Sequence, residues 1–226
     1  MIGQLVLQAR GQGRAELSRL YGLNVLRAET DPEGFWRLRR LRRAGRSLRL
    51  GGALRVLVPR DFPDWALLRS FGLRPVEPEP FVRALSAPLA LEALERQGVA
   101  PDRATVALRG LRADRDMLRT AVQLCPKVRR LVVDAPQGGR ELAAWLRQEF
   151  GIPVLPEGEA GQVALGFHPD APRQEQARLE LYGAAPDLAG LTLTAPELAG
   201  EDQDNLPLMT ALWEGGRLAW EDIKIT

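Results

Sequence analysis

The amino-acid sequence predicts an α/β protein with one parallel-sheet unit and a smaller N-terminal α/β region. Two observations carry this prediction. In the stretch Asp102–Pro156, three short apolar runs alternate with two segments whose apolar residues recur at helical spacing. Strands that alternate with helices of about a dozen residues imply a parallel sheet with right-handed crossovers. In addition, arginines are concentrated in residues 1–60, which sets that region apart from the rest of the chain.

The central stretch has clear signals for where its elements start and stop. Strands are expected at residues 104–108, 128–133 and 152–155, with a fourth at 162–167. Asp114 is suited to cap the first helix, because its carboxylate can accept a hydrogen bond from a first-turn amide, and Pro126 ends this helix. The second helix follows Gly138-Gly139 and ends at Gly151, the residue type most common just after a helix.

The N-terminal part is less regular. Strands are expected at residues 2–7, 54–58 and 73–76, and helices at 61–71 and 81–97, with Pro88 a candidate kink in the last. A turn is expected over Arg10–Arg14. Asp31-Pro32-Glu33 predicts a helix start, with a capping residue followed by proline at the first helical position. Two interpretations stay open for residues 17–26, namely a single strand, or a short helix followed by a strand.

The C-terminal part predicts shorter elements. Residues 170–176 are loop-like, and further strands are expected at 178–182, 191–194 and 217–225. Glu201–Asp204 is an acidic turn able to cap a short helix through Trp213. We place a domain boundary between residues 98 and 99, giving a basic α/β region 1–98 and a parallel-sheet domain 99–226. The tail 171–226 either completes the central sheet or packs on the N-terminal region.

Composition excludes several classes of protein and site. The chain has 226 residues and 45% hydrophobic content, enough for one or two domains with a core. It has no run of 18 uncharged apolar residues and no signal-peptide pattern, so we expect a cytoplasmic protein of bacterial type. Cys125 is the one cysteine, which rules out an internal disulfide and argues against a cysteine-built metal site. No metal ligand set is predicted.

Candidate catalytic residues are few. His168 is the one histidine, and with Asp170 it could act as a base at the end of a strand, although an ordinary loop role is favoured. Cys125 is expected to be a small buried residue, not a nucleophile. The acidic cluster of Glu201, Asp202 and Asp204 lacks the spacing of a calcium loop, so a solvated turn is favoured. No catalytic residue is predicted.

The charge is unevenly distributed. Residues 1–60 contain thirteen arginines against four acidic residues, an excess of nine positive charges, so the remaining chain carries a net charge of −7. Lysine occurs only at Lys127 and Lys224. The segment Arg37–Arg49 predicts an arginine-rich helix that can contact nucleic-acid phosphates or an anionic membrane, with Phe35 and Trp36 available for stacking. The favoured interpretation is a solvated face whose arginines pair with the acidic remainder of the chain.

At Thr105–Asp134 the chain resembles the start of a dinucleotide-binding Rossmann domain. The order of helix 81–97, a junction and then strand–helix–strand is similar to two-domain enzymes of the shikimate dehydrogenase and glutamyl-tRNA reductase type. This resemblance covers roughly residues 81–167 and is one of pattern. It implies a small N-terminal α/β domain, a nucleotide domain and NAD(P) as cofactor.

The glycine motif of that family is largely replaced. The family needs G-x-G-x-x-G at the first strand–helix turn, and only Gly110 corresponds, with Arg112 and Arg115 where the second and third glycines belong. Asp134 ends the second strand, near where an acidic residue would hold a ribose hydroxyl. The candidate ligand site is therefore Gly110, Arg112, Arg115 and Asp134. It would hold a phosphate-bearing small molecule by guanidinium groups instead of backbone amides.

From these observations we predict a non-enzymatic binding or interaction protein on a degenerate Rossmann-like scaffold. Two alternatives are kept. One is a nucleotide- or NAD(P)-dependent enzyme, and the other is a nucleic-acid-associated protein that uses the Arg37–Arg49 helix. The sequence identifies no cofactor and gives no oligomeric state.

Overall fold

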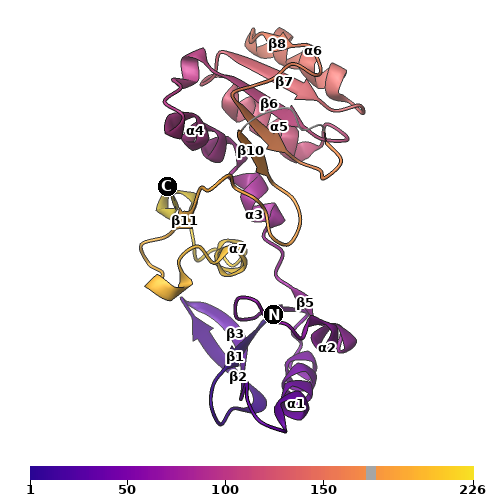
Figure 1. The fold of residues 1–226 in the computed structure, drawn as a ribbon, viewed down its shortest axis with the longest axis vertical. Helices are drawn as coiled ribbons and strands as arrows, with labels where there is room; N and C mark the ends of the chain where they lie inside the picture. Colours follow the sequence, from indigo (N-terminus) through magenta and orange to yellow (C-terminus); the bar gives the residue numbers. More distant parts are fainter. Residues whose placement is uncertain (172–176) are drawn as a thin grey trace. The chain divides into compact units, whose positions relative to one another are not determined.

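The chain folds into an α/β protein, as the sequence predicts, with two compact units (Figure 1). The computed structural model describes residues 1–171 and 177–226. Unit 1 comprises Met1–Glu77 and Ala195–Asp222, and unit 2 comprises Pro78–Thr194 and Ile223–Thr226. The predicted loop over residues 170–176 lies mostly outside the described residues.

Unit 2 contains a Rossmann-like sheet of five parallel strands. In spatial order they are β10-β9-β6-β7-β8. Their bounds are β6 (Thr105–Arg109), β7 (Arg130–Asp134), β8 (Val154–Leu155), β9 (Val163–Gly166) and β10 (Ala177–Glu180). Numbered from β6, this is the order 3-2-1-4-5 of a Rossmann sheet. All five β6 residues are buried, as expected for a central parallel strand.

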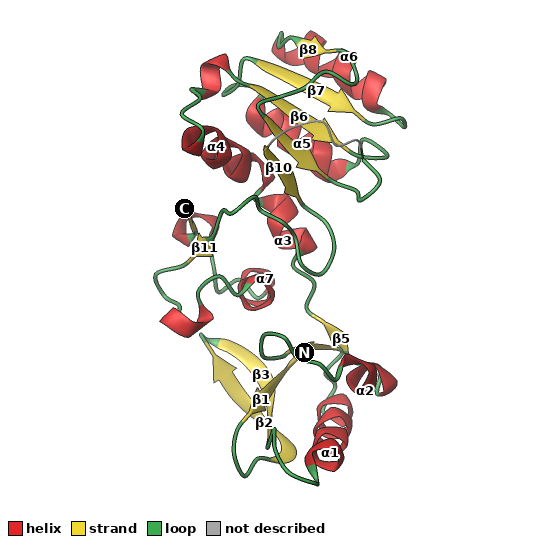
Figure 2. Ribbon diagram, viewed as in Figure 1, coloured by secondary structure: helices red, strands yellow, loops and turns green. Residues whose placement is uncertain are grey.

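Two helices link the first three strands of this sheet (Figure 2). Helix α5 (Arg115–Leu124) begins at the predicted cap, because the Asp114 carboxylate accepts a hydrogen bond of 2.9 Å from the Met117 amide. Helix α6 (Gly139–Phe150) ends at Gly151, whose φ of 65° is the left-handed conformation expected after a helix. Both predictions are confirmed.

The helix predicted over residues 81–97, with Pro88 as a candidate kink, is divided in two. The structure has α3 (Glu79–Ala84) and α4 (Ser86–Arg96), separated at Leu85. Pro88 explains the break, because proline lacks an amide hydrogen and its ring clashes with the carbonyl four residues earlier, which belongs to Ala84.

These helices also shift the boundary between the units. The division falls between Glu77 and Pro78, not between residues 98 and 99. Helix α4 buries Leu89, Ala90 and Leu94 within unit 2, and a buried hydrogen bond of 2.5 Å joins the Ser86 hydroxyl in α4 to the Thr120 hydroxyl in α5. Burial of this apolar face, together with a satisfied polar pair, accounts for why α4 belongs with the strands that follow it.

Unit 1 is built on a mixed five-stranded sheet in the order β2-β3-β1-β4-β5. The strands are β1 (Ile2–Leu7), β2 (Gln12–Leu20), β3 (Leu23–Thr30), β4 (Arg55–Leu57) and β5 (Arg74–Pro75). Strands β2 and β3 form an antiparallel hairpin, so residues 17–26 are neither a single strand nor a helix followed by a strand, and both interpretations are wrong. The hairpin turn, Tyr21-Gly22, has positive φ at both positions, the geometry that matches the strand twist. The turn expected over Arg10–Arg14 is shorter, because β2 already begins at Gln12.

One face of this sheet carries the core of unit 1. Helices α1 (Arg37–Leu50) and α2 (Trp65–Ser70) cover it, and Leu41, Ala44 and Leu48 of α1 are buried among the strands. The helix start predicted at Asp31 is wrong, since α1 begins six residues later. The Asp31 carboxylate instead accepts hydrogen bonds from the backbone amides of Glu33 and Arg10, which stabilises a turn in place of a first helical turn.

The C-terminal tail contributes to both units. Helix α7 (Leu206–Glu214) belongs to unit 1, where Arg55 of β4 pairs with Glu214 at 2.6 Å and Asp202 accepts a hydrogen bond of 2.6 Å from the Tyr21 hydroxyl. Asn205 caps α7, in place of the acidic residues that the sequence favoured. The predicted strand 217–225 reduces to β12 (Lys224–Ile225), which pairs antiparallel with β11 (Leu193–Thr194) in unit 2.

Candidate functional site

The unit 2 sheet has its strand-order reversal between β6 and β9. In parallel sheets of this type, ligands bind outside the carboxyl ends of the strands at such a reversal. Gly110 follows β6 and Phe167 follows β9, so the space beside these two residues is where a dinucleotide would be expected.

Arg83 of α3 occupies this position. Its Nη2 atom donates a hydrogen bond of 2.6 Å to the Phe167 carbonyl, and its Nε atom donates one of 3.1 Å to the Leu181 carbonyl. The guanidinium carbon lies 5.9 Å from the centre of the Phe167 ring. The Arg83 side chain is only 15% exposed. A cation supplied by the chain itself therefore fills the ends of β9 and β10.

Three carboxylates surround Arg83. Glu79 lies 2.9 Å away, one helical turn earlier on α3, and Asp114 and Asp116 at the start of α5 lie at 3.4 and 3.7 Å. A pyrophosphate would need the positive end of α5 and its free amides. Here the Asp114 carboxylate already accepts from the Met117 amide, and Asp116 pairs with Arg119 at 3.0 Å. The end of α5 is therefore already occupied by a carboxylate of the chain itself.

Two of the predicted ligand residues have contacts within the chain. Gly110 allows a helix to pack closely, and Asp134 forms an ion pair. A Cβ atom placed on Gly110 would lie 2.9 Å from the Met117 side chain, so the glycine makes room for α5. The Asp134 Oδ2 atom lies 2.5 Å from Nη1 of Arg109, whose side chain is fully buried. Asp134 does reach the carboxyl edge of the sheet as predicted, but its carboxylate is committed to Arg109.

Arg112 and Arg115 are exposed, and the structure shows no contact that brings them together with Asp134. The loop between Gly110 and Asp114 is hydrogen-bonded to the neighbouring loop, because the Ala113 amide donates to the Gln137 carbonyl and the Gln137 amide donates to the Leu111 carbonyl. Its backbone therefore does not form a phosphate cradle, and the residues present do not fit a dinucleotide. Binding of a smaller phosphate by Arg112 and Arg115 stays a prediction.

Neither Arg83 nor Arg109 was identified from the sequence as a residue of this site. Arg109 was expected only as the end of a strand. For Arg83 the one local signal is Glu79, four residues earlier on the same helix. Its other partners lie between 31 and 98 residues away in the chain, so no short-range pattern marks them.

The structure brings the candidate residues His168 and Asp170 together. The His168 Nδ1 atom accepts a hydrogen bond from the Asp170 amide and lies 3.6 Å from the Asp170 Oδ2 atom. Burial raises the pKa of the Cys125 thiol, which disfavours the reactive thiolate. Among the residues that the structure describes, no cluster of three or more His, Cys, Asp or Glu could hold a metal ion. In the same part of the chain, no helix is long and apolar enough to cross a membrane.

Helix α1 presents a strongly basic surface. We define its arginine face as the exposed side chains Arg39, Arg42, Arg43, Arg46 and Arg49. None of them forms an ion pair with any residue that the structure describes. By contrast, Arg37 pairs with Asp64 and Arg40 pairs with Asp31. The predicted pairing with the acidic remainder of the chain thus holds for Arg37, since the partner of Arg40 lies within residues 1–60 and the arginine face has no such pair among the described residues.

Two aromatic side chains stand at the N-terminal end of this face. Phe35 is 92% exposed and Trp36 is 51% exposed, and their rings meet edge to face with centres 5.1 Å apart. The Arg39 guanidinium carbon lies 5.2 Å from the centre of the Trp36 ring, a cation–π contact. The arginine face and the aromatic pair together form one continuous surface on α1.

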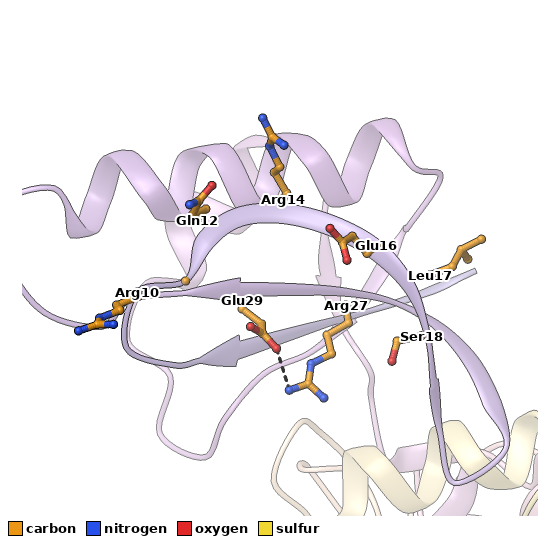
Figure 3. Close-up of a pocket in the computed structure, with 9 residues that line it drawn as sticks. Arg10, Gln12, Arg14, Glu16, Leu17, Ser18, Arg27 and Glu29 are labelled. Carbon is orange, nitrogen blue, oxygen red and sulfur yellow. Dashed lines mark ion pairs between the residues drawn. The ribbon is translucent and has the colours of Figure 1, made fainter.

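A polar hollow of about 630 Å³ lies on the β2–β3 hairpin (Figure 3). Arg10, Arg14 and Arg27 line it, but so do Glu16 and Glu29, and Arg27 is paired with Glu29 at 3.0 Å. Its charge is therefore largely balanced within the chain. The arginine face of α1 is the stronger candidate for an anionic partner, because no carboxylate offsets it.

Neither a protein-family description nor a curated protein matches the chain. Solved structures that it resembles include L-tryptophan dehydrogenase from Nostoc punctiforme, with 17% identity and a TM-score of 0.31 over 65% of this chain and 45% of the dehydrogenase. Another is arylmalonate decarboxylase, with 14% identity and a TM-score of 0.22 over 69% of this chain and 86% of the decarboxylase. Similarity at this level carries no argument about activity, so the function must be argued from the residues themselves.

Proposed function

We propose that this protein is a non-enzymatic binding protein that recognises a polyanion through the arginine face of α1. The observation that carries the proposal is the set of five exposed arginines on one helix, none of them paired with a described residue. A clustered positive field of this kind attracts anionic polymers and speeds their association. A partner of this chemistry is consistent with the cytoplasmic location expected from the sequence.

The helix offers a rigid support for these arginines. Leu41, Ala44 and Leu48 anchor its opposite side in the core of unit 1, so the arginines project from a fixed backbone. Guanidinium groups bind phosphate or sulfate with two parallel hydrogen bonds and are more weakly hydrated than ammonium groups. Every basic residue of the face is an arginine and none is a lysine, so each one can bind an anion in this two-bond geometry.

The arginine face also carries an internal electrostatic cost. Its members lie three or four residues apart, so like charges face each other along the helix, for example at Arg39 and Arg43 or at Arg42 and Arg46. Each such pair destabilises a helix by roughly 0.2–0.5 kcal/mol. A bound polyanion would relieve this repulsion, and the protein should be stabilised by it.

The proposal is tested by titrating the protein with fluorescently labelled polyphosphate at low salt. The triple variant Arg42→Gln, Arg43→Gln, Arg46→Gln should bind about tenfold or more weakly. It makes fewer phosphate contacts, so its binding releases fewer counterions. The matched control removes the same charge from exposed positions of unit 2, with Arg103→Gln, Arg129→Gln and Arg140→Gln. Equal loss in both triple variants would show that net charge alone matters, and the assignment to α1 would then be wrong.

The enzymatic alternative, an NAD(P)-dependent activity of the shikimate dehydrogenase type, is supported by the strand order and by the exposed guanidinium groups of Arg112 and Arg115. Arg83 at the strand ends and the Arg109–Asp134 pair oppose it. We expect millimolar NAD or NADP to leave the thermal unfolding midpoint unchanged. A rise that disappears in Arg112→Ala or Arg115→Ala would favour the alternative.

A further inference from the structure

We infer that the polyanion is a single-stranded nucleic acid, whose bases stack on Phe35 and Trp36 while its phosphates contact the arginine face. This inference rests on the proposed function and adds the partner's chemistry to it. Arginines alone would recognise any polyanion. The exposed aromatic pair at the end of the same face is the feature that favours a polyanion with flat apolar groups between its charges.

This pair is more exposed than the aromatic pair that packs with the core of the same unit. Phe62 and Trp65 form a second edge-to-face pair with ring centres 5.8 Å apart, and both pack with the core of unit 1. Phe35 and Trp36 make the same kind of contact, yet they lie outside the core, with Phe35 at 92% exposure. An aromatic ring held in water gains stability when another flat ring covers it, and every nucleobase offers such a face.

The arrangement along the helix fits a strand that follows α1. Phe35 and Trp36 precede the helix, Arg39 comes one turn later, and Arg49 lies in the last turn. At a rise of 1.5 Å per residue, the face from Arg39 to Arg49 extends over about 15 Å, which is room for a few nucleotides. Arg39 lies over the Trp36 ring and so links the stacking end of the surface to its charged part.

A duplex fits this surface less well. The bases of a duplex are already stacked on one another, so they cannot cover Phe35 or Trp36 without unstacking. Phosphates of a duplex could still contact the arginines, but the aromatic pair would then contribute little. Single strands present both groups at once, and stacking on aromatic side chains is typical of proteins that bind them.

An anionic membrane also fits less well. A helix that binds a membrane surface inserts a continuous apolar face between the lipid headgroups. The apolar face of α1, with Leu41, Ala44 and Leu48, is buried against the sheet of unit 1. Exposed apolar side chains lie only near the two ends of the helix, with Phe35, Trp36 and Leu38 at its start and Leu50, 81% exposed, at its last residue. The arginines project from the side that would face the headgroups, with little apolar area to insert.

The test compares two ligands of similar charge by fluorescence anisotropy, namely a short labelled oligouridylate and labelled polyphosphate, which lacks bases. In the double variant Phe35→Ala, Trp36→Ala, oligouridylate affinity should fall about 5- to 150-fold, because stacking is worth about 1–3 kcal/mol per base. Polyphosphate affinity should stay within about twofold. Leu38→Ala removes an exposed apolar group that cannot stack, and it should leave both affinities unchanged.

A second variant tests whether an aromatic ring of a different residue supports the same binding. Phe35→Tyr keeps an aromatic ring at the most exposed position, and it should retain the oligouridylate affinity of the parent protein. If the double alanine variant weakens both ligands equally, or neither, the inference of base stacking is overturned while polyanion binding stands. If the parent protein binds neither ligand, the proposed function itself fails.

Vesicles that contain phosphatidylserine provide the membrane arm of the same experiment. We expect oligouridylate to bind more tightly than these vesicles at equal ionic strength, and to displace the protein from them. Tight vesicle binding that depends on Phe35 and Trp36, with no aromatic dependence for oligouridylate, would overturn the inference in favour of a lipid surface.

Discussion

Arg109 and Asp134 form a buried ion pair at the carboxyl edge of the unit 2 sheet, with Nη1 and Oδ2 2.5 Å apart. They are also register partners in neighbouring parallel strands, β6 and β7. Arg109 in addition donates a hydrogen bond of 2.7 Å to the Glu159 carbonyl. The position at which a Rossmann enzyme would hold a ribose is thus occupied by a pair that is satisfied within the chain.

Asp134→Ala should lower the free energy of unfolding by about 2 kcal/mol or more, because it removes one charged hydrogen-bond partner from the buried Arg109 guanidinium. Chemical denaturation measures this loss. The double variant Arg109→Met, Asp134→Leu removes both charges together and should recover much of the lost stability. A cost below about 1 kcal/mol for Asp134→Ala would show that the pair is not buried as described.

Arg83→Met should also destabilise unit 2, by about 2 kcal/mol or more. The substitution leaves the Phe167 and Leu181 carbonyls without their donor and removes the cation from among Glu79, Asp114 and Asp116. Arg140→Met is the matched control, since Arg140 is 87% exposed and its ion pair with Glu157 is expected to contribute less than about 1 kcal/mol. Similar losses for the two variants would contradict a structural role for Arg83.

Tyr21 should give unit 1 an alkaline-sensitive contribution to stability. The hydrogen bond that Tyr21 donates to Asp202 raises the pKa of Tyr21 above its ordinary value of 10.0, and burial acts in the same direction. A raised pKa means that the folded state holds the proton more tightly than the unfolded state. The contribution is therefore fully present below pH 10 and is lost as the pH rises through the folded-state pKa.

The measurement is the free energy of unfolding from pH 8 to pH 11 for the parent protein and for Tyr21→Phe. We expect the variant to be less stable by about 1 kcal/mol at pH 8, the usual value of such a hydrogen bond, and the difference to shrink above pH 10. A difference that is constant across this range would contradict the hydrogen bond to Asp202 as its cause.

Local signals in the sequence were sufficient to predict where several helices of unit 2 begin and end. Asp114 caps α5 and Gly151 ends α6 because both act through neighbouring backbone groups. The same kind of signal misled at Asp31, where the carboxylate stabilises a turn by binding the amides of Glu33 and Arg10. The signal at Pro88 predicted a kink but not where the helix breaks, because proline disrupts the helix at the residues before it.

The candidate site was predictable only in part. The arginine-rich helix and the aromatic pair are visible in the sequence, since their residues are neighbours in the chain. Whether the arginines are paired depends on Asp31 and Asp64, which reach only Arg37 and Arg40 in the folded chain. Arg83 lies 98 residues from Leu181, so its place at the strand ends follows from the tertiary fold alone.

The salt dependence of oligouridylate binding tests the central claim most directly. If the five members of the arginine face each contact a phosphate, the logarithm of the affinity should fall against the logarithm of salt concentration with a slope of about −3.5. Each substitution of one of these arginines by glutamine should reduce that slope by about 0.7. Binding that does not weaken with salt, or no binding even at low salt, would contradict the assignment of α1 as the binding surface.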